Sequence, residues 1–470
     1  MDAPRIGRLR RDILRELKVF DDCFGRRDSR QHLLCYVGGQ VSNLKRKCVE
    51  AIADAADVPP RTLQDFLATH KWDHERAVDR LQQLVAEQHH DEQAIGLFDE
   101  TSFPKRGDKT VGVQHQYCGA RGKLDNCMVS VALGYANLRG EFRSTLDHRI
   151  FLPPSWDDDE ARRREAGVPD DLRHQPKWKI ALAMLERAQA NGVRFAWLTF
   201  DEGYGNNVQL LEALDRMGQS YVAEVSPSMH GWLIEPTVLH KQHPKAPRPK
   251  GRPQRLPRLS AQSAKAIRLD RLCSYSYPMR DQPWVDYHVK NGHKGPIVWQ
   301  ARAARFRLNV AHEPDGRRCA SRFALPSAPR WLIQAYNPLT GETKYFVSNA
   351  SAGVPIERLL HVAFSRWHVE RSFQDEKDLL GLDQFECRRY VAVQRHLILT
   401  ALSHLLLARL RLKLIDEGRA SDPGAGGKKA DRATGAAGRG RVDPGRVAAA
   451  RSAAQASAPH RRTDRACAAT

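Results

Sequence analysis

Two short apolar segments constrain the fold of this chain most strongly, because each resembles a buried strand that leads to an acid. The first is AIGLFDE, from Ala94, and the second is VRFAWLTFDE at residues 193–202. Apolar runs of this length between turn signals are typical of strands inside a sheet. We therefore expect Asp99 and Asp201 at strand ends, where carboxylates of neighbouring strands can converge. For Asp201 alone, a turn-forming aspartate before glycine is the ordinary explanation.

The segments around these two strands predict a mixed sheet. Strands are expected to follow the first acid as an antiparallel meander, whereas helices flank the strand that carries the second acid. Strands that alternate with helices indicate parallel pairing, so the expected fold class is α/β or α+β, a mixed sheet flanked by helices. The further strands are expected within 105–119, 126–137, 141–153 and 219–226, and the helices at 177–192 and 207–218.

The chain is too long for one ordinary core, and changes in composition divide it. Its middle contains a stretch rich in Pro, Lys and Arg, which we expect to be an exposed basic loop. From Asp416 onward Leu, Phe, Trp, Tyr and Met are absent, and we hypothesise that a frameshift near residue 415 replaced the native C-terminus. The expected parts are 1–90, a helical domain; 91–225, the first part of the core; 226–350, a β-rich insertion with the basic loop; 351–414, a helical completion of the core; and 415–470, a disordered tail.

The net charge of +20, from 75 Lys and Arg against 55 Asp and Glu, favours a polyanionic partner, of which nucleic acid is the usual one. A generally basic proteome is the alternative. Basic residues recur through 1–90, which predicts a DNA-binding domain, although a solvated basic face explains them equally. We find no apolar run long enough to span a membrane and no apolar signal-peptide core. Nine cysteines without a CxxC pair favour free thiols in a reducing cytosol.

The charged segment RWHVERSFQDEK, residues 366–377, predicts a helix because it contains neither Gly nor Pro. Arg366, Glu370 and Lys377 are spaced four and seven residues apart. At about 100° per residue this spacing places all three on one stripe. A solvated face with an i,i+4 ion pair is the common explanation of such a pattern. The alternative is a metal-binding carboxylate flanked by cations that hold a phosphodiester.

Asp99, Asp201 and Glu370 together have the chemistry of a divalent-metal site. Mg²⁺ takes hard oxygen ligands, typically one or two carboxylates with water and substrate in the remaining positions. Two such ions about 3.5–4 Å apart can activate an attacking oxygen and stabilise a leaving one in phosphoryl transfer. The three acids in this order, two on strands and one on a helix, are stronger evidence for a metal site than any one of them alone.

These residues resemble the motifs of bacterial insertion-sequence transposases of the DDE type, in the branch with a Tyr-x2-Arg-x3-Glu-x6-Lys signature. Arg366, Glu370 and Lys377 fit its spacing, and the tyrosine position falls at Ala363. FDETSFPKRG resembles the first-acid motif, with Asp99, and LTFDEGYG resembles the second, with Asp201. The resemblance extends from about residue 20 to residue 412.

The resemblance implies a ribonuclease-H-like catalytic core. It also implies a transposase that binds the terminal inverted repeats of its element, cuts the ends with metal-activated water and joins the 3′-hydroxyls to target DNA. The implied catalytic and metal-binding residues are Asp99, Asp201 and Glu370, with two Mg²⁺ ions, for which Mn²⁺ can substitute. The implied DNA-binding residues are Arg366 and Lys377, with Lys105 and Arg106 as weaker candidates. Such an enzyme would work as a homodimer in a synaptic complex on double-stranded DNA, in the bacterial cytoplasm at the nucleoid.

Two other functions remain compatible with the sequence. A ribonuclease-H-like nuclease would cut without strand transfer, and the basic helical N-terminus and the β-rich insertion argue against it. A catalytically inactive, transposase-derived DNA-binding repressor would need none of the three acids, and their presence argues against it. A metal-dependent cleavage assay distinguishes these functions.

Overall fold

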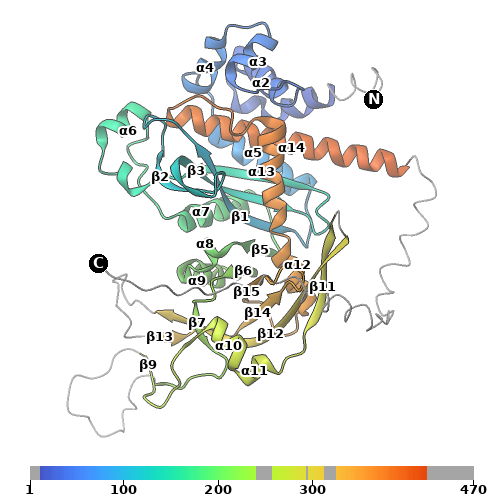
Figure 1. Ribbon diagram of the computed structural model, residues 1–470. Helices are drawn as coiled ribbons and strands as arrows, with labels where there is room; N and C mark the ends of the chain where they lie inside the picture. The colour runs from blue at the N-terminus through green and yellow to red at the C-terminus, as the bar shows by residue number, and fades with distance from the viewer. Residues whose placement is uncertain (1–10, 240–256, 293–294, 312–323, 421–470) are drawn as a thin grey trace, which may run out of the picture. The chain divides into compact units, whose positions relative to one another are not determined.

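The computed structural model of the protein describes residues 11–239, 257–292, 295–311 and 324–420 (Figure 1). Met1–Leu412 form one compact unit. Most of the expected basic loop and of the expected tail lies outside the described residues. The last helix, α14 (Tyr390–Ala420), continues past residue 415, where we expected the tail to begin.

The N-terminal segment is helical, as expected from its apolar spacing. Trp72 stacks on Phe24 and Phe66, with ring centroids 4.8 and 5.4 Å apart. Asp73 caps the next helix, because its side chain accepts a hydrogen bond from the backbone N–H of Arg76. The elements are η1 (Lys18–Cys23), α2 (Arg27–Gln40), α3 (Val49–Ala55), α4 (Pro60–Ala68) and α5 (His74–Gln88).

Helix α14 lies between α2–α4 and the sheet (Figure 1). On one side, His396 Nδ1 lies 2.8 Å from the Tyr36 hydroxyl, and Gln40 Nε2 donates to Thr400 Oγ1 at 2.8 Å. On the other side, Gln394 accepts a hydrogen bond from the backbone N–H of Ile150. The prediction that this apolar helix packs on the core is confirmed.

The sheet is mixed, as predicted, and its strands run in the order β10-β7-β12-β14-β15-β6-β5-β1-β3-β2. β5 pairs in parallel with β1 and with β6, whereas β3 pairs antiparallel with β1, β2 and β4. The core strands are β1 (Ile95–Pro104), β2 (Gln114–Cys118), β3 (Lys123–Ala136), β4 (Arg143–Ile150), β5 (Trp197–Phe200) and β6 (Tyr221–Val225).

The β-rich segment extends this same sheet, because β15 pairs antiparallel with β6. The predicted hairpin is confirmed: β14 and β15 pair across a turn in which Gly341 has a φ of +75°. The elements are β7 (His230–Trp232), β8 (Val238–Leu239), β9 (Arg258–Leu259), β10 (Ile267–Arg268), α10 (Leu269–Tyr275), α11 (Tyr277–Arg280), β11 (Val285–Gly292), β12 (Gly295–Ala311), β13 (Ala324–Pro326), β14 (Arg330–Tyr336) and β15 (Thr343–Ser348).

Helices cover both faces of the core strands. Leu97 packs in one apolar cluster with residues of α12 and α13, whereas Phe98 packs in another with residues of α5, α7 and α9. Side chains alternate between the faces of a strand, so odd and even positions of β1 meet different helices. The helices are η2 (Pro154–Trp156), α6 (Glu160–Ala166), α7 (Lys177–Ala190), α8 (Glu202–Gly205), α9 (Val208–Arg216), α12 (Ile356–Phe364) and α13 (Trp367–Leu380).

Candidate active site

Asp99 and Asp201 lie side by side because the residues that precede them, Phe98 and Phe200, are partners in the pairing of β1 with β5. Phe98 of β1 and Phe200 of β5 are register partners in the parallel pairing, which ends there. Leu97 faces α12 and α13, so alternation turns Asp99 to that same face. Asp201 has extended backbone, with a ψ of −179°, and continues the alternation of β5 by one residue.

One expectation about Asp99 is wrong: it lies in the middle of β1 rather than at its end. β1 continues to Pro104 because it pairs with β3 over its whole length. Asp201 does follow directly on its strand. It is also the N-cap of α8, so the turn-forming explanation holds for it as well.

Arg366 joins the strand acids to the helix acid. Its Nη1 lies 3.0 Å from Asp99 Oδ2, and its Nη2 lies 2.5 Å from Glu370 Oε1. Arg366 is the N-cap residue of α13, so its side chain and that of Glu370, four residues later, project from the same turn. The Arg366 side chain is 22% exposed and that of Glu370 is 56% exposed, so the site is open on the helix side.

The site carries a surplus of negative charge. The pKa of Asp99 is raised to about 7: burial raises it most, Arg366 opposes the rise, and the carboxylates of Asp201 and Glu370 add to it. Burial acts to lower the pKa of the Arg366 guanidinium, and the surrounding carboxylates outweigh it and raise that pKa. One arginine therefore balances only part of the charge.

The sequence reasoning missed a fourth acid, Glu224. Phe200 pairs with Ala223 in the parallel β5–β6 ladder, so Glu224 occupies the position beside Asp201. Val222 packs in the apolar cluster under α12 and α13, so Glu224 faces the same side. The signal was a single acid inside an otherwise apolar strand, YVAEV. We refer to Asp99, Asp201, Glu224, Glu370 and Arg366 as the carboxylate cluster.

Glu100, the neighbour of Asp99, has a different environment. Lys177 Nζ on α7 lies 2.6 Å from Glu100 Oε2. Because α7 packs on the face opposite to α13, the two adjacent acids belong to different faces of the sheet. Glu100 therefore offers a matched control for Asp99.

Of the expected DNA-binding residues, Lys377 and Lys105 lie together beside the contacting rings of Phe103 and Phe385 rather than beside Arg366. Lys377 Nζ lies over the Phe103 ring, 5.9 Å from its centroid, and burial lowers the pKa of Lys377. Lys105 Nζ donates to the Phe385 carbonyl at 3.0 Å, and burial lowers its pKa to about 8. Arg106 is exposed. Lys377 lies two turns beyond Glu370, about 10 Å along the helix, so a shared stripe does not bring it to the acids.

The donor chemistry of the cluster fits Mg²⁺, because four carboxylates supply hard oxygen ligands. Within the described ranges, however, no group of three or more His, Cys, Asp or Glu side chains is arranged to hold a metal ion. The guanidinium of Arg366 lies between Asp99 and Glu370 instead. In this arrangement the positive charge among the carboxylates is supplied by the protein.

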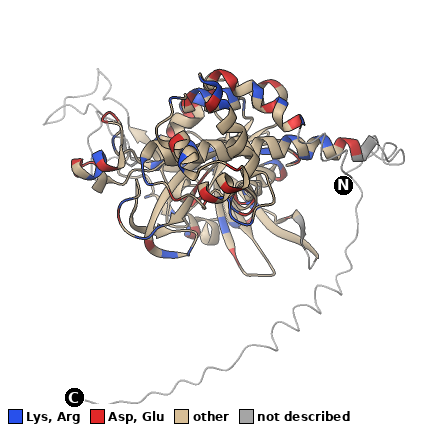
Figure 2. Ribbon diagram, turned by 90° about the horizontal axis from the view of Figure 1, so that it is seen from above, with Lys and Arg blue, Asp and Glu red and all other residues tan. Residues whose placement is uncertain are grey.

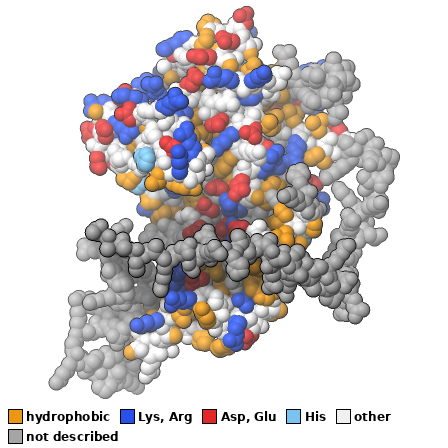
Figure 3. Space-filling model, viewed as in Figure 1, with side chains coloured by type: hydrophobic (Ala, Val, Ile, Leu, Met, Phe, Trp, Pro, Cys, Tyr) orange, Lys and Arg blue, Asp and Glu red, His pale blue; other side chains and the backbone are white. Residues whose placement is uncertain are grey.

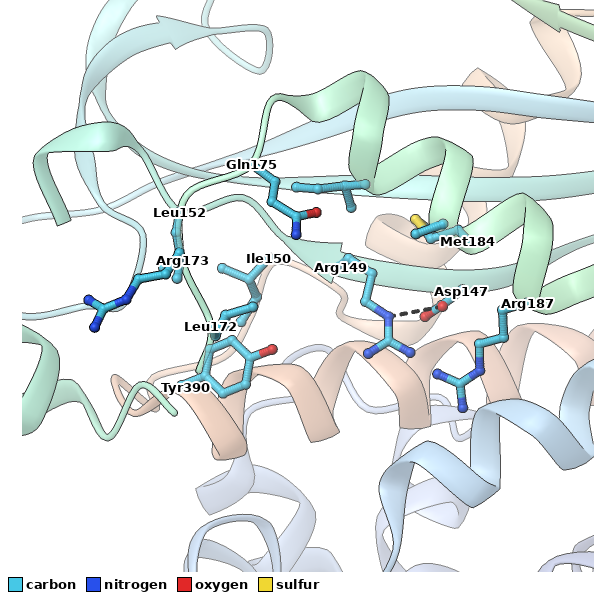
Figure 4. Close-up of a pocket in the computed structure, with 12 residues that line it drawn as sticks. Asp147, Arg149, Ile150, Leu152, Leu172, Arg173, Gln175, Met184, Arg187 and Tyr390 are labelled. Carbon is cyan, nitrogen blue, oxygen red and sulfur yellow. Dashed lines mark hydrogen bonds and ion pairs between the residues drawn. The ribbon is translucent and has the colours of Figure 1, made fainter. Parts of the chain in front are cut away.

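A cavity of about 260 Å³ lies elsewhere, between β4, α7 and the start of α14 (Figure 4). Arg149 and Arg187 point into it beside Asp147, and Arg149 Nε donates to Asp147 Oδ2 at 2.9 Å. Glu75 pairs with both arginines, at 2.7 Å for Arg149. The cavity shares no residue with the carboxylate cluster, and its charges compensate one another.

Basic side chains do not form an unbroken surface on the face in view. Lys and Arg are interspersed with Asp and Glu over the N-terminal helices and α6 (Figure 3). From above, both signs of charge alternate along the same helices (Figure 2). In the described part of the chain, no helix is long and apolar enough to cross a membrane.

Residues 19–296, more than half of the chain, match the protein family described as DDE superfamily endonuclease. This range includes Asp99 and Asp201 and ends before Glu370. The chain is also similar to a protein of Microchaete diplosiphon named probable transposase for insertion sequence element IS701. The two are 29% identical over 207 residues, which are 44% of this chain and 50% of that relative. The chain thus spans about half the length of the relative.

Proposed function

The chain belongs to the DDE superfamily endonucleases, and on that premise we propose that it is a DNA transposase that cuts the ends of its element and joins them to target DNA. Its mixed sheet with helices on both faces has the ribonuclease-H-like fold that membership implies, as the sequence predicted. The observation that carries the proposal is the convergence of three acids on one face of the sheet: Arg366 pairs with Asp99 and Glu370, and Asp201 lies beside Asp99. The similarity to a protein named as a transposase supports transposition over plain cleavage.

The proposed catalytic residues act as ligands rather than as nucleophiles. Asp99 and Asp201 would hold divalent cations from the sheet, and Glu370 would complete the site from α13. When bound, two Mg²⁺ ions, or Mn²⁺ in their place, supply Lewis-acid activation of the attacking oxygen and stabilise the leaving one. Arg366 lies within reach of the same position and would contact the phosphate of the scissile strand.

The remaining parts of the proposal concern DNA. Residues 1–90 would bind the terminal inverted repeats through their basic side chains, and Arg106 would add a phosphate contact. Lys377 and Lys105 would do so after leaving their present contacts with Phe103 and Phe385. Two chains would hold the two ends in a synaptic dimer at the nucleoid.

The test is a cleavage and strand-transfer assay on the element's own ends with Mg²⁺, in which the parent chain is compared with Glu370→Gln and Glu100→Gln. Glutamine keeps the shape of the side chain and removes its charge. We expect the parent and Glu100→Gln to cut and join, and Glu370→Gln to bind DNA without cutting.

Each alternative function has its own result in this assay. Cutting without joined products would identify a nuclease, and binding without cutting by the parent would identify a repressor. Equal activity of the parent and Glu370→Gln would mean that Glu370 is not catalytic. It would then be an ordinary surface residue in an i,i+4 ion pair, which its helix spacing also allows.

A further inference from the structure

We infer that Arg366 is an internal counter-ion that occupies the place of a divalent cation, and that Glu224 receives its guanidinium when a cation binds. The inference rests on the proposed function and extends it to residues that the three-acid motif does not include. It concerns how the protein holds the site together before the metal arrives.

The charge of the cluster supports the first part of the inference. Four carboxylates, Asp99, Asp201, Glu224 and Glu370, face two cations, Arg366 and Lys344. Lys344 also pairs with Glu342, so the formal surplus is at least two negative charges. Like charges that converge without a counter-ion destabilise a folded chain. Arg366 reduces this repulsion by spanning Asp99 and Glu370 with its two Nη groups. A metal ion that binds those oxygens must therefore displace the guanidinium.

The position of Glu224 supports the second part. Its Oε1 lies 2.8 Å from Lys344 Nζ, which anchors the carboxylate to β15. Its Oε2 lies 4.0 Å from Arg366 Nε, the one guanidinium nitrogen that does not pair with Asp99 or Glu370. A small rotation of the guanidinium would close this gap and keep Arg366 paired. The two Nη groups, which the acids occupy now, would then be free for a phosphate.

This arrangement makes Arg366 and metal competitors for the same oxygens. Two ligands that exclude each other show a negative coupling, typically 5- to 150-fold in affinity. Removing the guanidinium should therefore strengthen metal binding by about that factor. Removing the carboxylate that receives it should weaken metal binding, but only while Arg366 is present.

The experiment is a titration of the full chain with Mn²⁺ in the absence of DNA, followed by electron paramagnetic resonance of the free ion. The chains are the parent, Arg366→Gln, Glu224→Gln, the double variant and the control Arg371→Gln. Arg371 lies on the same helix and pairs with Asp375 at 3.1 Å, away from the acids. We expect Arg366→Gln to bind Mn²⁺ roughly 5- to 150-fold more tightly than the parent and Arg371→Gln to match the parent.

Glu224→Gln should weaken Mn²⁺ binding in the parent and leave it unchanged in the Arg366→Gln background. Equal weakening in both backgrounds would make Glu224 a direct ligand, and no change in either would make it a partner of Lys344 alone. Both results overturn its receiving role. Arg366→Lys keeps the positive charge but loses the two Nη groups that span Asp99 and Glu370. Its Mn²⁺ affinity should therefore lie between those of the parent and Arg366→Gln. The counter-ion role is overturned if neither Arg366 variant binds more tightly than the parent.

This titration is separable from the cleavage assay. If the parent cuts DNA and Arg366→Gln gains no Mn²⁺ affinity, the inference fails and the proposed function stands. If the affinities shift as expected and DNA is not cut, the proposed function fails and the counter-ion role stands. If neither the parent nor Arg366→Gln binds Mn²⁺, both are overturned.

Discussion

Helix α13 carries two charged clusters, which differ in almost every physical respect. The carboxylate cluster gathers around Arg366 at its start. Six residues after Glu370, the buried Glu376 forms a second cluster with two histidines: its carboxylate lies 3.2 Å from His148 Nε2 and 3.3 Å from His404 Nδ1. We call these three residues the imidazole cluster. Its Glu376 and His148 side chains are 0% exposed, whereas Glu370 is 56% exposed.

The difference lies in the balance of charge. In the imidazole cluster one carboxylate faces two imidazoles; burial acts to raise the pKa of Glu376, but the imidazoles hold it well below its usual range. In the carboxylate cluster four acids share two cations, and the pKa of Asp99 is raised to about 7. The first cluster is closed to solvent, so it stabilises the fold by joining α13 to β4 and α14. The second carries a surplus of negative charge and is open to solvent at Glu370, so it can accept a cation and a substrate.

The largest effect should come from Asp99→Asn. Losing one ligand removes several kcal/mol of transition-state stabilisation, which is roughly a 10³-fold loss of DNA cleavage. The fold should tolerate the change, because it relieves repulsion among the acids. Single-turnover cleavage and urea unfolding measure the two effects. An inactive Glu100→Gln, or an unfolded Asp99→Asn, would remove the contrast between the two clusters.

Glu376→Gln should have the opposite profile. Breaking a buried ion pair by removing one partner costs about 3–5 kcal/mol of stability. Urea unfolding of the variant should show that loss, whereas Mn²⁺ affinity, measured below the unfolding transition, should match that of the parent. A loss of Mn²⁺ affinity with unchanged stability would mean that Glu376 belongs to the active site.

His396 provides a pH test in a third environment. Burial lowers its pKa to about 4, against 6.5 for an unperturbed imidazole. Between these values the unfolded chain binds a proton that the folded chain does not, so stability falls as the pH is lowered from 6.5 to 4. The expected slope from this group is about 1.4 kcal/mol per pH unit. Urea unfolding across that range should show a smaller slope for His396→Gln, and an unchanged slope would contradict the assignment.

The smallest effect is expected for Arg371→Gln. The exposed Arg371 forms an i,i+4 pair with the half-buried Asp375 on α13, and Asp375 keeps a second partner in Arg143. The change should cost about 0.3–0.5 kcal/mol, as for other such pairs. Urea unfolding at two salt concentrations measures it. A loss of unfolding free energy above 2 kcal/mol would mean that Arg371 is a structural residue like those of the two clusters, and not an ordinary surface residue.

The sequence was most informative where local patterns decide structure. Apolar runs predicted the strands that carry Asp99 and Asp201, and the absence of Gly and Pro predicted α13. It was less informative about Lys377, because helical spacing gives an angle and not the neighbour that a side chain meets. Lys377 shares a stripe with Glu370 and nonetheless lies over Phe103.

The sequence by itself predicted most core elements, the mixed sheet and the three candidate acids. The tertiary structure decided that Arg366 pairs with two of these acids. The tertiary structure decided that Glu224 joins them, because strand register, which no single strand encodes, places it beside Asp201. It also decided that Glu376 is closed off by two histidines from β4 and α14. Both depend on pairings between segments far apart in the chain. Local sequence fixes which face a side chain takes, and only packing fixes which charges it meets there.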